Sequence, residues 1–406
     1  MKSLRNALNK IKPDFEKGGR FAKLHSLYDA IETFLFLPSE TSGSGVHIHD
    51  AANSKRAMSV VLLALFPALL FGIYNTGYQH YLAIGQPAEL WSCLLFGLLA
   101  LLPKIIVSYA VGLGIEIVVA QIKGHEVQEG FFVSGMLIPM IVPIDTPLWM
   151  LGVATAFSVI FAKEVFGGTG YNIFNVALIT RAFLFFAYPS KMSGDQVFVR
   201  TSDSFGFGAP EVVNGVAQTI DGYSGATPLG QIEAMSNGAP VFHGIDGHVL
   251  SLWDMFVGLI PGSVGETSTL AILLGAALLI ITGIASWKII ASVFAGGFIM
   301  AAFINLFGGS PAMQTPPIEH LLLGGFAFGA VFMATDPVTA ARTETGKWIY
   351  GFLIGVICIL IRVFNPGYPE GMMLAILFMN AFAPLIDYFV VDKNIKQRLK
   401  RATIKQ

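Results

Sequence analysis

Residues 57–76 read AMSVVLLALFPALLFGIYNT, a run of twenty residues without a charged side chain. The hydrocarbon core of a bilayer is about 30 Å thick, and an α-helix needs roughly 20 apolar residues to cross it. Comparable apolar stretches recur along the chain, so we expect an all-α polytopic membrane protein with about ten transmembrane helices, some short or broken. The stretches lie near residues 57–76, 92–122, 131–144, 147–162, 173–188, 267–286, 289–307, 321–334, 348–363 and 371–389.

The overall composition agrees with this fold class. Of 406 residues, 54% are hydrophobic and 13% are charged, and the mean hydropathy is +0.66. Soluble domains typically carry about twice that charged fraction, so the composition excludes an ordinary soluble enzyme. The lipid bilayer is therefore an expected partner, and nucleic acid is not.

Basic residues indicate which side of the membrane each connection faces. Of the 25 Lys and Arg residues, nine precede the first stretch and six follow the last. Five more fall in connections assigned to the same side, namely Lys123, Lys163, Lys288, Arg342 and Lys347. Because basic residues concentrate in cytoplasmic loops, we expect both termini in the cytoplasm and the loop 189–250 in the periplasm.

An internal similarity divides the membrane part in two. Residues 149–188 align with 348–388 at a shift of 199 to 200 positions. Five helices per half would give the two halves opposite orientations, as in transporters built from inverted repeats. The expected divisions are an N-terminal segment 1–54, a first repeat 55–188, a periplasmic loop 189–250, a second repeat 251–390 and a basic tail 391–406.

The N-terminal segment is polar and basic, with apolar residues at helical spacing between Phe21 and Leu37. This pattern predicts an amphipathic helix, either at the cytoplasmic membrane interface or packed on a partner protein of the same complex.

Charged residues inside apolar stretches need a partner, because each costs roughly 2.5–3.5 kcal/mol at a helix centre. Lys104 suggests that only the later part of the stretch 92–122 spans the membrane, unless the helix is strongly tilted. Arg181 should pair with a carboxylate or a cofactor, and Glu164 and Asp195 are the candidate partners. Arg362 is expected at the bilayer border.

Cysteine and histidine offer little for redox or metal chemistry. Cys93 and Cys358 are the only cysteines, whereas an iron–sulfur cluster usually needs four thiolates. His47 and His49 have no further close ligands, so no metal site is expected beyond Na⁺. Any electron transfer must therefore use an organic cofactor.

The periplasmic loop contains the heptapeptide Asp221-Gly222-Tyr223-Ser224-Gly225-Ala226-Thr227. It resembles the flavinylation signal of the B subunit of Na⁺-translocating NADH:quinone reductases and of the related Rnf D subunit. The resemblance implies that a flavin transferase joins FMN through its phosphate to the last threonine, Thr227. A phosphoester needs a hydroxyl, and small neighbours leave the backbone open to the transferase. An ordinary loop turn is the alternative interpretation.

Nearly the whole chain resembles the B subunit of these quinone reductases. The motifs that carry the resemblance are Phe15–Gly19, His125–Val133, Ala162–Gly170, Phe326–Gly329, Phe332–Pro337 and Asn365–Met373. It implies an inner-membrane subunit of a Na⁺-pumping NADH:ubiquinone oxidoreductase, assembled with the A, C, D, E and F subunits. Electrons would pass from a flavin on the C subunit to the FMN on Thr227, then to a noncovalent riboflavin and to ubiquinone.

The glycine-rich segment 167–172 is our candidate for part of the riboflavin pocket. Asn172 and Asn175, with Gly168, would hydrogen-bond the flavin ring edge, because amides supply both a donor and an acceptor. A helix break capped by these amides is the alternative.

Two further sites follow from the resemblance. Acidic residues connected with Na⁺ uptake and coupling match Glu116, Asp336 and Asp387. A cap in a helix-terminal turn is the alternative for Asp336, and an interfacial carboxylate for Asp387. The quinone site matches Gly112, Phe131 and Phe132, although phenylalanine in membrane helices usually serves packing.

Two other functions remain possible. An Rnf-type D subunit would share the threonine-linked flavin but serve ferredoxin:NAD⁺ electron transfer without a quinone. A flavin-free channel or secondary transporter would also use inverted repeats. No dinucleotide-binding fingerprint is present, so NADH itself should bind elsewhere.

Overall fold

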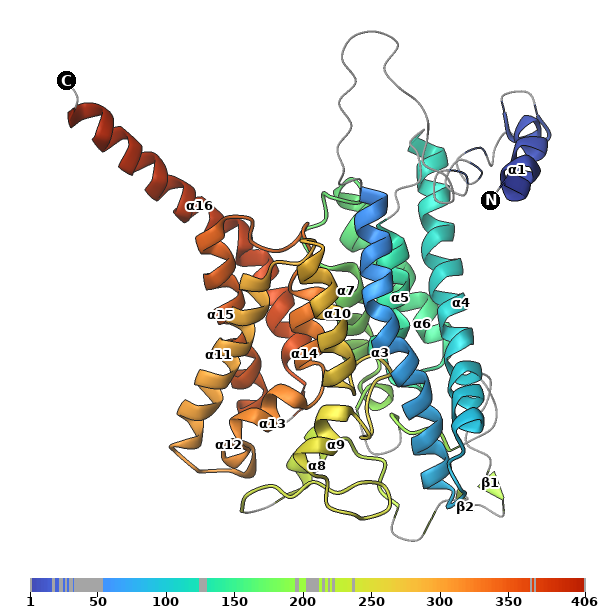
Figure 1. The fold of residues 1–406 in the computed structure, drawn as a ribbon, viewed down its shortest axis with the longest axis vertical. Coiled ribbons are helices and arrows are strands. Elements are labelled where there is room, and N and C mark those ends of the chain that lie inside the picture. Colours follow the sequence, from blue (N-terminus) through green and yellow to red (C-terminus); the bar gives the residue numbers. More distant parts are fainter. Residues whose placement is uncertain are drawn as a thin grey trace.

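The computed structural model describes residues 2–16, 19–21, 25, 28, 32, 54–123, 130–193, 197–201, 212–213, 216–217, 220, 223–235, 238–365, 367–368 and 370–404. Regular structure in this part of the chain is almost entirely helical (Figure 1). The exceptions are the two-residue strands β1 (Val212–Val213) and β2 (Val216–Ala217), which pair antiparallel. The all-α fold class is confirmed.

Six helices are long and apolar enough to cross a membrane. Large apolar side chains are exposed along them, Trp91 and Ile122 among them, as expected for helices that face lipid. The six are α3 (Ser54–Ala83), α4 (Leu90–Lys123), α6 (Leu148–Ser158) with its continuation through η2 (Val159–Lys163) and η3 (Glu164–Phe166), α11 (Trp287–Asn305), α15 (Glu344–Phe364) and α16 (Met372–Ile404).

The remaining apolar stretches form shorter or interrupted helices. The short ones are α5 (Phe131–Ile141), α7 (Val176–Ala187) and α10 (Thr269–Ile281). The interrupted one consists of α13 (Pro317–Leu322), α14 (Phe326–Phe328) and η5 (Gly329–Met333), which follow the single-turn helix α12 (Pro311–Gln314). Helices thus form in all ten predicted stretches, whereas their arrangement as two inverted five-helix repeats stays a prediction.

The two ends of the helix bundle carry different elements (Figure 1). Helix α1 (Lys2–Phe15), which we did not anticipate from the sequence, lies toward the same end as the projecting part of α16. The opposite end carries β1, β2, α8 (Pro228–Ala234) and α9 (Leu252–Val257). Most of the amphipathic stretch 21–37 lies outside the described residues, and the side of the membrane each end faces stays a prediction.

The second predicted stretch is one continuous helix, α4, over its full length. Lys104, in its middle, is fully buried and donates a hydrogen bond from Nζ to the carbonyl oxygen of Pro143, 2.6 Å away, just beyond the end of α5. Gly265 N donates to another carbonyl at this helix end, that of Met140, at 2.8 Å. Lys104 therefore donates to a carbonyl beyond the end of a short helix, and which part of α4 spans the membrane stays a prediction.

Arg362 is buried inside the protein, and its place at the bilayer border stays a prediction. Its guanidinium donates to the carbonyl oxygens of His320, Leu323 and Glu370. The first two lie where α13 ends, and a helix end leaves its last carbonyls without intrahelical donors. Arg362 supplies those donors in a place that water does not reach.

The ion-pair partners of Arg181 differ from those that we expected. Of the two candidate partners, Glu164 forms an ion pair with Lys123 instead, and Asp195 lies outside the described residues. Arg181 pairs with Glu266 at 2.6 Å and with Glu370. The partners come from the second half of the chain, so this buried cluster joins the two halves.

We predict that Arg362→Leu destabilises the protein, because the carbonyl oxygens of His320 and Leu323 lose their donor, whereas that of Glu370 keeps Met372 N. The free energy of unfolding should fall by about 2–4 kcal/mol, given the usual cost of unsatisfied buried groups. Thermal denaturation of the detergent-solubilised protein measures this. Arg398→Leu, in the exposed part of α16, is the control, and equal midpoints for the two variants would contradict the prediction.

Candidate functional site

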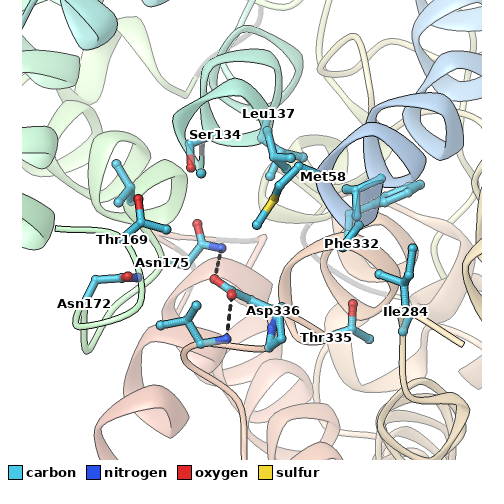
Figure 2. A pocket seen from close by; sticks show the side chains of 18 of the residues that line it. Met58, Ser134, Leu137, Thr169, Asn172, Asn175, Ile284, Phe332, Thr335 and Asp336 are labelled. Atoms are coloured by element: carbon cyan, nitrogen blue, oxygen red, sulfur yellow. Dashed lines mark hydrogen bonds between the residues drawn. The ribbon is translucent and has the colours of Figure 1, made fainter. Parts of the chain in front are cut away.

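A cavity with about 830 Å³ of empty space lies among the first turns of α3, helix α5, the start of α7 and the end of η5 (Figure 2). We call it the Asp336 cavity. Its lining is mostly apolar, with polar groups contributed by Ser134, Lys163, Thr169, Asn172, Asn175, Thr335 and Asp336.

Asn175 and Asp336 face one another on one wall of this cavity (Figure 2). Asn175 is the N-cap of α7: its Oδ1 accepts from Ala177 N and Leu178 N, and its Nδ2 donates to Asp336 Oδ2 at 3.1 Å. Asp336 Oδ1 accepts from Val338 N at 3.0 Å. The capping interpretation is confirmed for Asn175, whereas Asp336 accepts its backbone hydrogen bond within a turn. Both side chains also line the cavity.

The glycine-rich segment before α7 brings Thr169 and Asn172 to the same cavity. Gly168 has φ +98°, a backbone conformation that favours glycine, and its amide donates to the carbonyl of Lys163 at 3.0 Å. Asn172 donates to the carbonyl oxygen of Phe174 at 3.1 Å. Of the predicted riboflavin residues, Asn172 and Asn175 line the cavity, whereas Gly168 shapes the loop behind it.

Two π-helical turns position the ionisable residues of the cavity. The turn η2 ends at Lys163, and η5 ends three residues before Asp336. Such turns add a residue to a helix and are frequent at functional sites. From the sequence we expected Lys163 in a connection between helices. In the structure it is 3% exposed and lines the cavity, and no sequence pattern distinguished it.

Lys163 forms a buried ion pair with Glu116 of α4. The second carboxylate oxygen of Glu116, Oε2, has no hydrogen-bond partner among the described residues. The ammonium of Lys163 also lies 6.0 Å from the ring centre of Phe131. Glu116, a predicted Na⁺ residue, is thereby linked to the cavity that contains Asp336.

The predicted quinone residues pack against each other beside this pair. A Cβ atom on Gly112 would lie 1.9 Å from the ring of Phe131, so only glycine fits there. Phe131 is fully buried, while Phe132 is partly buried and accepts a hydrogen bond from Tyr109 through its carbonyl.

Asp387 lies away from the cavity, on α16, and its carboxylate is occupied by hydrogen bonds. Oδ2 accepts from Arg342 N at 2.7 Å, and Oδ1 accepts from the amide and the hydroxyl of Thr343. Thr343 is itself the N-cap of α15. These contacts are those of a residue that holds the start of a helix.

Thr227 lies toward the other end of the molecule and lines a second, smaller cavity with about 340 Å³ of empty space. We call it the Thr227 cavity. Thr227 is the N-cap of α8, and its Oγ1 accepts a hydrogen bond from Gly230 N at 3.2 Å.

Of the other residues of the heptapeptide, Ser224 is exposed, and Gly225 and Ala226 are buried. Asp221 and Gly222 lie outside the described residues. Other lining residues include Phe198, Leu229, Pro261, Ser263, Glu266, Thr267 and Glu370.

A small apolar cluster fixes α8 against α9. Leu229 and Met255 belong to it, together with Phe242, Leu250, Ile260 and Leu323. Helix α9 begins with a capping box in which Ser251 and Asp254 bond each other. Hydrogen bonds from Ser251 hold the pKa of the Asp254 carboxyl below its usual range. Both short helices are therefore well anchored around the Thr227 cavity.

Helix α3 runs past both cavities. Met58 lines the Asp336 cavity, and Asn75 donates to the carbonyl of Ile260, a residue that lines the Thr227 cavity, at 2.9 Å. A helix rises 1.5 Å per residue, so these two points are roughly 25 Å apart along the axis. This distance is most of the roughly 30 Å hydrocarbon core of a bilayer.

Within the described residues, no group of three or more His, Cys, Asp or Glu side chains is arranged to hold a metal ion. Cys93 and Cys358 are both buried and unpaired with each other.

Comparison with known proteins shows to which family the chain belongs. The sequence model of the NQR2, RnfD, RnfE family matches residues 41–396. The chain belongs to the NQR2, RnfD, RnfE family. Its relatives within that family include the B subunit of the Na(+)-translocating NADH-quinone reductase of Pseudomonas paraeruginosa, which is 45% identical over 98% of this chain and 99% of its own. The proteins of the same name from Chromohalobacter salexigens and Azotobacter vinelandii are 45% and 44% identical, over 98% of this chain and 96% and 99% of their own.

The resemblance inferred from the sequence motifs is thus confirmed, and so is the coarser conclusion about location. Six long apolar helices and membership of the NQR2, RnfD, RnfE family indicate an integral membrane protein.

We predict that Gly112→Ala in this family member disturbs the packing beside Lys163, because the added methyl group overlaps the ring of Phe131. Overpacking of this kind usually costs about 1–3 kcal/mol. Thermal denaturation measures the loss, and Gly112→Ala/Phe131→Leu should recover much of it. Gly114→Ala is the control, since a Cβ there meets no atom within 4 Å. Equal losses at both glycines would contradict the prediction.

Proposed function

We propose that this chain is the B-type subunit of a sodium-pumping NADH:ubiquinone oxidoreductase. It would carry FMN on Thr227, hold a noncovalent riboflavin in the Asp336 cavity and pass electrons on to ubiquinone, coupled to Na⁺ translocation. The observation that carries the proposal is the position of Thr227: the last residue of the flavinylation motif lies at the edge of a cavity, far along α3 from a second cavity lined with amides. The relatives are named as B subunits of a Na(+)-translocating NADH-quinone reductase, which supports the sodium and quinone part of this function.

The hydroxyl of Thr227 is suited to esterification. It takes part in its capping bond as an acceptor, through a lone pair of Oγ1. A phosphoester replaces only the hydroxyl proton, so the capping bond to Gly230 can persist after FMN is attached. Thr227 is partly exposed, which suits access by a flavin transferase.

The residues of the Asp336 cavity suit a flavin ring. Its apolar walls, Leu137 and Phe332 among them, can cover a planar ring system. Asn175 retains one amide proton beyond the one given to Asp336, and Asn172 adds a second amide. A flavin takes up and releases electrons, whereas the side chains bind it, orient it and exclude water.

The sites for sodium and quinone would adjoin this cavity. Glu116 and Asp336 supply carboxylate oxygens, which suit a hard cation. Asp387 already accepts three hydrogen bonds, which supports a structural role for it. Phe131, Phe132 and Gly112 would border the quinone, next to the Lys163–Glu116 pair.

The proposal includes partners and an orientation. The chain would sit in the bacterial inner membrane with the A, C, D, E and F subunits, with its termini cytoplasmic and the Thr227 loop periplasmic, next to the flavin of the C subunit. The Rnf D subunits are members of the same family, and quinone reduction by the assembled complex would exclude that alternative. A flavin-free transporter would keep its activity without Thr227.

We predict that Thr227 carries FMN. Peptide mass spectrometry of the chain expressed with its flavin transferase should find the mass of an FMN phosphoester on the Thr227 peptide. Fragment ions should place it on Thr227 and not on Ser224. Thr227→Ala should lose both the mass increment and in-gel flavin fluorescence. An unmodified peptide despite an active transferase would rule out the relay and favour the transporter.

We predict that Asn175→Asp lowers the noncovalent flavin content of the complex, because it removes the amide donor and places two carboxylates face to face. The double variant Asn175→Asp/Asp336→Asn restores one donor between the residues and should regain flavin. Both variants keep an N-cap oxygen for α7. Extraction and fluorescence of the free flavin measure the content, and a native level in the single variant would contradict this use of the cavity.

A further inference from the structure

Two ionisable side chains are among the described residues that line the Asp336 cavity: Asp336 and Lys163. They lie on different segments, because Lys163 ends η2 while Asp336 follows η5. The proposed flavin and quinone roles give Lys163 no part. A buried lysine that faces a cavity of this size nevertheless fixes a positive charge beside whatever the cavity holds.

Lys163 is paired with Glu116, which does not line the cavity. Glu116 is 4% exposed, and its Oε2 has no partner among the described residues. Among the described residues, the carboxylate is thus linked to the cavity only through its ion pair with Lys163. With both groups away from water, their electrostatic effects on a neighbour are weakly screened.

We propose that Lys163 stabilises the reduced form of the molecule bound in the Asp336 cavity. Glu116 acts through Lys163 as a positioning residue and limits this stabilisation. This inference rests on the proposed function, because it takes the occupant to be the electron-carrying flavin. Lys163 lines the cavity and Glu116 does not, so the positive member of the pair is the one in contact with the occupant.

The two members of the pair act with opposite sign. An electron adds negative charge to the cavity, and the ammonium of Lys163 favours that state, which raises the midpoint potential of the occupant. Glu116 draws the ammonium toward itself and adds a negative charge behind it, which lowers the potential. Asp336 adds a negative charge elsewhere in the cavity lining, bound by Asn175 and Val338 N, and the variants of the test leave it unchanged.

The test is a redox titration of the assembled complex in a Thr227→Ala background, which removes the covalent flavin of this chain. Lys163→Gln should shift the midpoint potential of the noncovalent flavin downward, and Glu116→Gln should shift it upward. The double variant should lie between the two. Lys163→Arg keeps the charge and serves as the control, with a potential close to that of the background.

Flavin content, measured by extraction from the same samples, separates two kinds of failure. Absence of a noncovalent flavin from the background complex would overturn the proposed function of the cavity and this inference with it. Bound flavin at native content, with potentials that do not move or that move in the same direction in both single variants, would overturn the role of Lys163 alone. Where Lys163→Gln fails to assemble, the upward shift in Glu116→Gln and the unchanged potential in Lys163→Arg decide the question.

Discussion

The arrangement depends on how interrupted helices satisfy their backbone groups away from water. Each helix end leaves N–H or C=O groups without intrahelical partners, and hydrocarbon cannot supply them. Here Lys104 donates to a carbonyl beyond α5, Arg362 donates at the end of α13, and Asn175 caps the start of α7. These side chains allow helices to stop inside the protein, and both cavities lie beside such ends.

The apolar runs predict where helices form, because the length of a span follows from bilayer thickness. They do not predict the partners of Arg181, since Glu266 and Glu370 lie 85 and 189 residues away along the chain. Lys163 was also missed as a cavity residue. Its burial depends on a π-helical turn, which adds one residue to a helix and leaves no pattern in the hydrophobic periodicity.

Part of the candidate site could be predicted because its chemistry is local. Asn172, Asn175 and Thr227 each stand in a short motif whose residue types suit one task. Asp336 was assigned to sodium from the resemblance, and the structure adds that it binds Asn175 on one wall of the cavity. That contact joins residues 161 positions apart, so only the packing of the two halves of the chain could place flavin and sodium candidates at one wall.

The separation of the two cavities along α3 has an electrical consequence for the proposed relay. An electron that moves from Thr227 to the Asp336 cavity crosses most of the membrane dielectric toward the side that we expect to be cytoplasmic and negative. A full charge crossing costs about 2.3 kcal/mol per 100 mV, so this step would work against roughly 2 kcal/mol for each 100 mV of membrane potential. The membrane potential that the proposed enzyme builds up would then slow its own electron transfer. The length of α3 between the two cavities sets the size of this effect.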